Sequence, residues 1–94
     1  MLVKNIHGTG ERKCKCGSWL AHWEKGSGKT AKYCCVKNCG SSADVGGHVL
    51  LGNAGQSHYI VPLCNSHNLE NGAVLDVFDG VNPVSANVSE TCGR

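Results

Sequence analysis

Apolar residues occur along the chain in short groups separated by glycine-rich breaks. One group has helical spacing: Ser18 is a suitable N-cap, and Trp19 and Trp23 would share one face of a helix that continues through Glu24. This helix most simply covers the core. The other groups are rich in Val, Ile, Leu or Tyr, which favours β-strands. They cover residues 30–36, 48–51, 58–61, 73–78 and 83–88. The pattern therefore predicts a short helix followed by several short strands.

The connections between these groups refine the prediction. Residues 52–56 contain two glycines and an asparagine between two strand segments, which indicates a β-hairpin. After Pro62 there is room for a short helix that ends at Gly72. We therefore expect a hairpin that leads into a helix. Because the chain has 94 residues, no repeat and no long linker, a single domain over residues 1–94 is predicted.

The apolar content is too small to stabilise this fold by a core alone. It reaches 40% only because seven cysteines are counted, and the large side chains comprise two Trp, two Tyr, one Phe and one Met. Small domains with a weak core usually need disulfides, a bound metal or a partner. The number of cysteines and their expected redox state distinguish these possibilities.

We expect the cysteines to be reduced. The first residues lack the apolar run of a secretory signal, and no apolar stretch could span a bilayer, so a cytoplasmic protein without membrane contact is predicted. Structural disulfides are rare in that compartment. Seven is also an odd number, which a fully paired disulfide framework cannot use. Metal binding is therefore the favoured role of the cysteines.

Two residue pairs have the spacing of zinc ligands. Zn²⁺ in structural sites takes four sulfur or nitrogen ligands in a tetrahedron, and one turn can supply two of them. Either Cys34 or Cys35 can pair with Cys39, and Cys64 is followed by His67. The predicted hairpin lies between the pairs and would bring them together. We therefore predict a structural zinc site, with ordinary buried thiols as the alternative.

Three further cysteines lie outside these pairs, namely Cys14, Cys16 and Cys92. Together with His22 or His7 they could form a second metal site. The Cys-x-Cys spacing is tight for that purpose, and it is not the Cys-x-x-Cys spacing of thiol oxidoreductases. The question of a second site stays open at this level.

Positive charge is concentrated in the first part of the chain. Residues 1–40 carry eight Lys or Arg and two Glu, whereas the remainder carries one Arg and five acids. The net charge of +2 hides this asymmetry. A basic half could bind nucleic acid, and the alternative is a solvated face with scattered lysines.

From Cys34 to Asn68 the chain resembles the HNH and endonuclease VII group of ββα-metal nucleases. The resemblance rests on the cysteine pair, on Gly47-His48-Val49 at the start of the hairpin, and on Pro62-Leu63-Cys64-Asn65-Ser66-His67-Asn68 at the start of the helix. It implies that Cys34, rather than Cys35, joins Cys39, Cys64 and His67 around the zinc.

The same resemblance implies a catalytic site beside the zinc. His48 would be the general base, and Asn68 would bind a catalytic Mg²⁺ or Mn²⁺, so both would converge on one phosphate. Gly47, however, stands where active members usually carry an acid, and Tyr59 stands where HNH members carry their middle Asn. Residues 41–93 contain no Lys or Arg. His48 packed within a strand and Asn68 in a helix-turn hydrogen bond are the alternatives.

We therefore expect a small α+β, zinc-stapled domain of treble-clef or ββα-metal type, with short β-hairpins and one or two short helices. Its HNH-like core would cover residues 34–72, between a basic N-terminal segment (1–33) and C-terminal strands (73–90). The expected function is a zinc module that binds nucleic acid or protein through the basic N-terminal half and the Trp19–Trp23 face. The alternative is an HNH-type endonuclease that uses His48 and Asn68.

Overall fold

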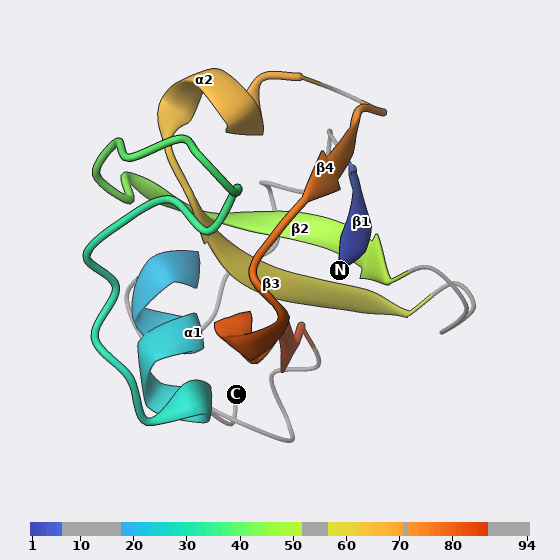
Figure 1. The fold of residues 1–94 in the computed structure, drawn as a ribbon. Coiled ribbons are helices and arrows are strands. Elements are labelled where there is room, and N and C mark those ends of the chain that lie inside the picture. Colours follow the sequence, from blue (N-terminus) through green and yellow to red (C-terminus); the bar gives the residue numbers. More distant parts are fainter. Residues whose placement is uncertain (7–17, 52–56, 71, 87–94) are drawn as a thin grey trace.

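The computed structural model describes residues 1–6, 18–51, 57–70 and 72–86. Within these ranges five strands form one antiparallel sheet of order β4-β1-β2-β3-β5, accompanied by two α-helices (Figure 1). The α+β class is therefore confirmed. The elements are β1 (Leu2–Asn5), α1 (Trp19–Ser27), β2 (Val45–Leu51), β3 (His58–Leu63), α2 (Asn65–Asn68), β4 (Val74–Asp76), the 3₁₀ helix η1 (Asp79–Val81) and β5 (Val84–Ser85).

The β2–β3 pair is the centre of the sheet. Its register runs from Val45 opposite Leu63 to Leu50 opposite His58, which confirms the predicted antiparallel pairing. The predicted hairpin loop at 52–56 lies outside the described residues. The strands expected after residue 72 extend the sheet at both edges, with β4 against β1 and β5 against β3. Both are shorter than predicted, and residues 87–88 lie outside the described part.

Strand β1 was not predicted, although it lies between β4 and β2. Its four residues alternate between exposed and buried, with Val3 and Asn5 facing the interior. This alternation is the mark of a half-buried strand, but four residues with a lysine and an asparagine make it a weak signal. Its neighbours β2 and β4 come much later in the chain, so only the tertiary structure reveals the pairing.

The strand predicted over residues 30–36 is wrong. This segment makes only isolated bridges, and its successive amides bond to different parts of the chain. The N–H of Cys34 donates to the carbonyl of Ser41 at 2.8 Å, whereas that of Cys35 donates to Pro62 in β3 at 2.9 Å. Residues 30–36 therefore belong to a loop, which these hydrogen bonds and the packing of Cys34 and Cys35 in the core attach to the sheet.

The two faces of the sheet contact different structures. Side chains alternate along a strand, so Val61 and Leu63 of β3 point to one face, where they pack in a cluster that includes Cys34 and Cys64. Ile60 points to the other face and packs in a separate cluster with Trp23 of α1. The cysteine-bearing loop and α1 therefore use opposite faces of β3.

Helix α1 is defined by local capping and by one close approach to β2. The Ser18 hydroxyl accepts a hydrogen bond from the Ala21 N–H at 3.0 Å, as predicted, and Gly28 ends the helix with φ of 72°. A Cβ atom at Gly46 would overlap the backbone of Trp19 and Leu20. Glycine at this position of β2 therefore lets the first turn of α1 lie directly on the strand.

The Trp19–Trp23 pair packs on the core, which confirms the predicted core-covering helix and leaves no exposed Trp19–Trp23 face for a partner. Trp23 is only 4% exposed, and its indole N–H donates to the carbonyl of Asn82 at 3.1 Å. Trp19 is half-buried and packs on the same cluster. In so small a chain, the few aromatic residues of an amphipathic helix are needed to cover the sheet.

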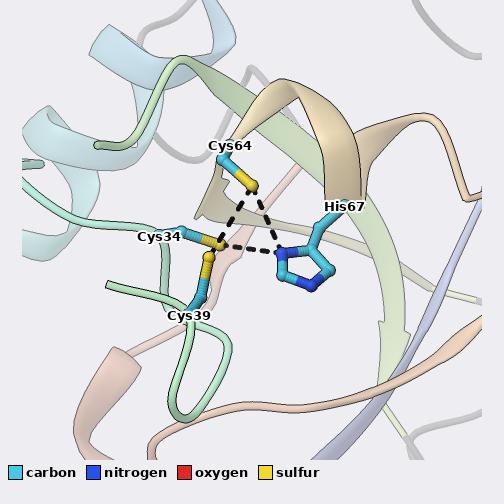
Figure 2. Close-up of side chains that lie close together, drawn as sticks. All are labelled: Cys34, Cys39, Cys64 and His67. Atoms are coloured by element: carbon cyan, nitrogen blue, oxygen red, sulfur yellow. Dashed lines mark hydrogen bonds between the residues drawn. The ribbon is translucent and has the colours of Figure 1, made fainter. Parts of the chain in front are cut away.

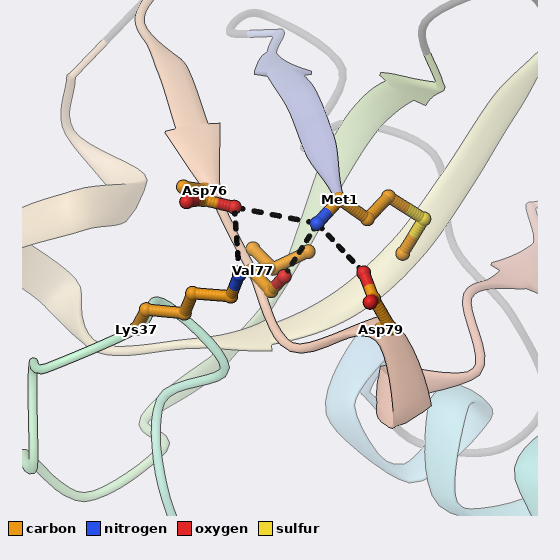
Figure 3. Close-up of polar contacts among 5 residues, drawn as sticks. All are labelled: Met1, Lys37, Asp76, Val77 and Asp79. Atoms are coloured by element: carbon orange, nitrogen blue, oxygen red, sulfur yellow. Dashed lines mark hydrogen bonds and ion pairs between the residues drawn. The ribbon is translucent and has the colours of Figure 1, made fainter.

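Strand β1, the segment after β4 and the cysteine-bearing loop meet around the amino group of Met1 (Figure 3). The amine donates to the Val77 carbonyl at 2.9 Å and forms ion pairs with Asp79 at 2.9 Å and Asp76 at 3.3 Å. Lys37 also pairs with Asp76, at 3.5 Å. The hydrogen bond between the amine and Asp79 raises the pKa of the amine and lowers that of the carboxyl. Exposed pairs of this kind contribute little stability.

Among the described residues, no helix is both long enough and apolar enough to cross a lipid bilayer.

Candidate metal centre

Three cysteines and one histidine from two segments converge on one point (Figure 2). Cys34 and Cys39 lie on the loop between α1 and β2, Cys64 precedes α2, and His67 lies within α2. Their ligand atoms all lie within 4.8 Å of one another. The four residues predicted to bind zinc are therefore brought together, and they could hold a metal ion.

Three of the six separations between the ligand atoms are close to those of a tetrahedral ion. Nδ1 of His67 lies 3.2 Å from Sγ of Cys64 and 3.5 Å from Sγ of Cys34, and Sγ of Cys39 lies 3.9 Å from Sγ of Cys64. A tetrahedron with Zn–S bonds of about 2.3 Å and Zn–N bonds of about 2.0 Å has edges of about 3.5 to 3.8 Å. A disulfide would bring two sulfurs to about 2.05 Å. The donor set and its spacing fit Zn²⁺.

Cys34 and Cys35 differ in whether they join the converging group. Both are buried in the same core cluster, but among the described residues the group of possible metal ligands includes Cys34 and not Cys35. Burial raises the pKa of the Cys35 thiol to about 12. The geometry therefore favours Cys34 over Cys35 as a ligand.

The thiols in the centre differ in their acidity. Burial raises the pKa of Cys34 to about 11, whereas hydrogen bonds from the backbone and side chain of Ser41 lower the pKa of Cys39 to about 7. A bound metal must displace the proton of Cys34 to use its thiolate, so binding and proton release are linked.

The loop turns sharply around Cys39. Asn38 and Gly40 on either side have φ of 64° and 72°, and the N–H of Cys39 donates to the carbonyl of Val36 at 3.2 Å. Positive φ is accessible to glycine and, among other residues, most readily to asparagine. These two residues let Cys39 point back toward Cys34.

Asn5 of β1 holds the end of α2 in place. Its side chain is fully buried, and its Nδ2 group donates to the carbonyls of His67, Asn68 and Glu70 at 3.1, 2.9 and 2.9 Å. The last carbonyls of a helix lack partners within the helix. Sequence reasoning missed this role, because the only signal was a polar residue at an inward position of a strand that was not predicted.

Asp44 supports the other end of α2. Its Oδ2 atom accepts a hydrogen bond from the N–H of Asn65 at 3.0 Å, and its own N–H donates to the carbonyl of Leu63 at 2.9 Å. This helix has a single turn and ends at Asn68, earlier than the predicted end at Gly72. Contacts from Asn5 and Asp44 thus position the turn that carries His67.

His48 and Asn68 do not converge. His48 is 5% exposed and lies edge-on to Trp19 of α1, with ring centroids 4.6 Å apart. The preceding residue, Gly47, faces the opposite way, where a Cβ would lie 3.2 Å from Oδ1 of Asn68 and overlap Leu63. The two predicted catalytic residues therefore lie on opposite faces of β2. A side chain at position 47 would have to displace the side chain of Leu63.

Of the residues considered for a second site, only His22 is described. It is fully buried, and its Nε2 atom lies 2.7 Å from the carbonyl oxygen of Ser85. His7, Cys14, Cys16 and Cys92 lie outside the described residues. The question of a second metal site therefore stays open.

Comparisons with protein-family models, with characterised proteins and with solved structures find no match for this chain. The resemblance to HNH nucleases therefore stays a prediction, and the metal centre has to be interpreted from its own geometry.

Proposed function

We propose that the chain is a binding module whose fold is held together by a structural Zn²⁺ ion. The observation that carries this proposal is the convergence of Cys34, Cys39, Cys64 and His67 at tetrahedral spacing. All four positions around the ion would be filled by protein atoms. Structural zinc sites are closed in this way, whereas catalytic sites keep one position open.

The location of the centre supports a structural role. Cys34 and Cys64 are buried members of the larger core cluster, next to Val61 and Leu63 of β3. A metal at this point would link the long loop before β2 to the turn after β3. It would thus supply the staple that the weak apolar core requires.

The arrangement also supports a treble-clef-like or ββα-metal-like interpretation of the fold. One ligand pair comes from a sharply turned loop, the β2–β3 pair follows, and the second ligand pair lies at the start of α2. A nuclease has no comparable support, because His48 and Asn68 lie on opposite faces of β2.

Metal analysis and thermal unfolding test the proposal. Purified protein should contain zinc, and Cys64→Ser should contain one zinc fewer per chain. A strong chelator should unfold the wild type, whereas Cys64→Ser should be unfolded with or without the chelator. Absence of zinc from the wild type, together with a melting curve that ignores the chelator, would refute the proposal.

A further inference from the structure

Two aromatic side chains stand out on the surface beside the metal centre. Tyr33 is 65% exposed and Phe78 is 53% exposed. Two cavities of about 630 and 430 Å³ each include Tyr33, Cys34 and Phe78 among their walls. The cavities therefore adjoin the same two rings, and we call this region the Tyr33–Phe78 surface.

The charged residues that line the two cavities are all lysines. Lys37 lines the larger cavity, Lys29 and Lys32 line the smaller one, and neither lining contains a carboxylate. Two carboxylates lie close to this lining and are paired: Asp76 with Lys37, and Asp79 with the amine of Met1 (Figure 3). A ligand in the cavities would meet ammonium groups and aromatic faces.

The two rings are held by the same backbone that carries the metal ligands. Tyr33 directly precedes Cys34, and the N–H of Phe78 donates to the carbonyl of Cys35 at 3.1 Å. The segment before β2 and the segment after β4 are thereby joined. A metal bound by Cys34 would fix the position of Tyr33 relative to Phe78.

We propose that the Tyr33–Phe78 surface binds single-stranded nucleic acid, an inference that rests on the zinc-stapled module proposed above. Exposed rings offer stacking platforms for unpaired bases, and the lysines beside them offer contacts for the phosphates between those bases. A duplex keeps its bases stacked inside and cannot use the rings in this way. Lysine is depleted in protein–protein interfaces, whereas lysines line both cavities here.

Fluorescence anisotropy with labelled oligonucleotides of about ten nucleotides tests this inference. The full chain should bind single-stranded DNA or RNA more tightly than the matching duplex or a mononucleotide. Tyr33→Ala and Phe78→Ala should each weaken binding roughly 5- to 100-fold, whereas Tyr33→Phe should keep the wild-type affinity. Leu69→Ala is the matched control, because Leu69 is 70% exposed and lines neither cavity.

The salt dependence gives a second readout. Each phosphate contact contributes about −0.7 to the slope of log affinity against log salt for single strands. Lys32→Ala should therefore make the slope shallower by about 0.7, and Lys4→Ala on β1 should leave it unchanged. Zinc content and melting temperature, measured for every variant, separate lost contacts from lost folding.

Two results would overturn the inference: no binding to any single strand at low salt, or equal affinity of the wild type and a Tyr33→Ala/Phe78→Ala double variant. If the zinc content is normal, either result refutes only the proposal of a nucleic-acid partner. If the purified protein contains no zinc, the zinc-stapled module itself is refuted, and with it the basis of the nucleic-acid proposal.

Discussion

The side-chain amide of Asn5 lies 3.1 Å from the backbone carbonyl oxygen of His67, and this contact joins strand β1 to the turn that carries a metal ligand. The same amide also reaches the carbonyls of Asn68 and Glu70. One buried side chain of β1 thus binds the backbone at the C-terminal end of α2. The metal centre therefore depends on a residue that cannot itself reach the ion.

Asn5→Ala should destabilise the domain and weaken metal binding. The substitution removes three part-buried hydrogen bonds and leaves the carbonyl of Asn68 without this donor, which costs about 2 kcal/mol. Chemical denaturation should show this loss, and competition with a zinc indicator should show a lower affinity. Lys4→Ala on the same strand is the control, because Lys4 is exposed and its loss should change the stability by less than about 0.5 kcal/mol. Equal stabilities of the two variants would contradict the role of Asn5.

The neighbouring cysteines should behave differently when each is replaced. Cys34→Ala should lose one zinc per chain and unfold, because site formation and folding are one equilibrium in small zinc domains. Cys35→Ala should keep the zinc and lose only about 1 kcal/mol, since it removes a buried thiol from the core. Metal analysis and circular dichroism measure both effects. Loss of zinc from Cys35→Ala alone would reverse the assignment.

Gly46→Ala should destabilise the packing of α1 on β2. The added methyl group would overlap the backbone of Trp19 and Leu20, and overpacking of this kind costs about 1 to 3 kcal/mol. Gly80→Ala is the matched control, because a Cβ there has open space around it. Thermal unfolding of the two variants compares them directly. A Gly46→Ala variant as stable as Gly80→Ala would show that α1 can move away without cost.

His48→Ala should reduce stability and leave any cleavage of nucleic acid unchanged. The side chain is buried against Trp19, so its removal should cost about 1 to 2 kcal/mol. Incubation with single- and double-stranded DNA and RNA, with Mg²⁺ or Mn²⁺, provides the assay. The wild type and the variant are compared at a temperature where both are folded. Cleavage that vanishes only in the variant would restore the nuclease interpretation.

Local signals in the sequence identified several parts of the fold correctly. The Ser18 cap, the β2–β3 pairing and the Cys64–His67 spacing each depend on residues that are close in the chain. Capping and turn formation act over such short distances, so their residue preferences are visible in the sequence. The strand predicted over 30–36 failed because its amides find partners in separate segments.

The sequence by itself determined which side chains could bind a metal, because ligand chemistry and pair spacing are local properties. It did not determine that Cys34 joins the converging group while Cys35 does not, or that Asn5 supports the helix of His67. Nor did it determine that His48 and Asn68 lie on opposite faces of β2. Those outcomes depend on how segments far apart in the chain pack, and only the tertiary structure decides that.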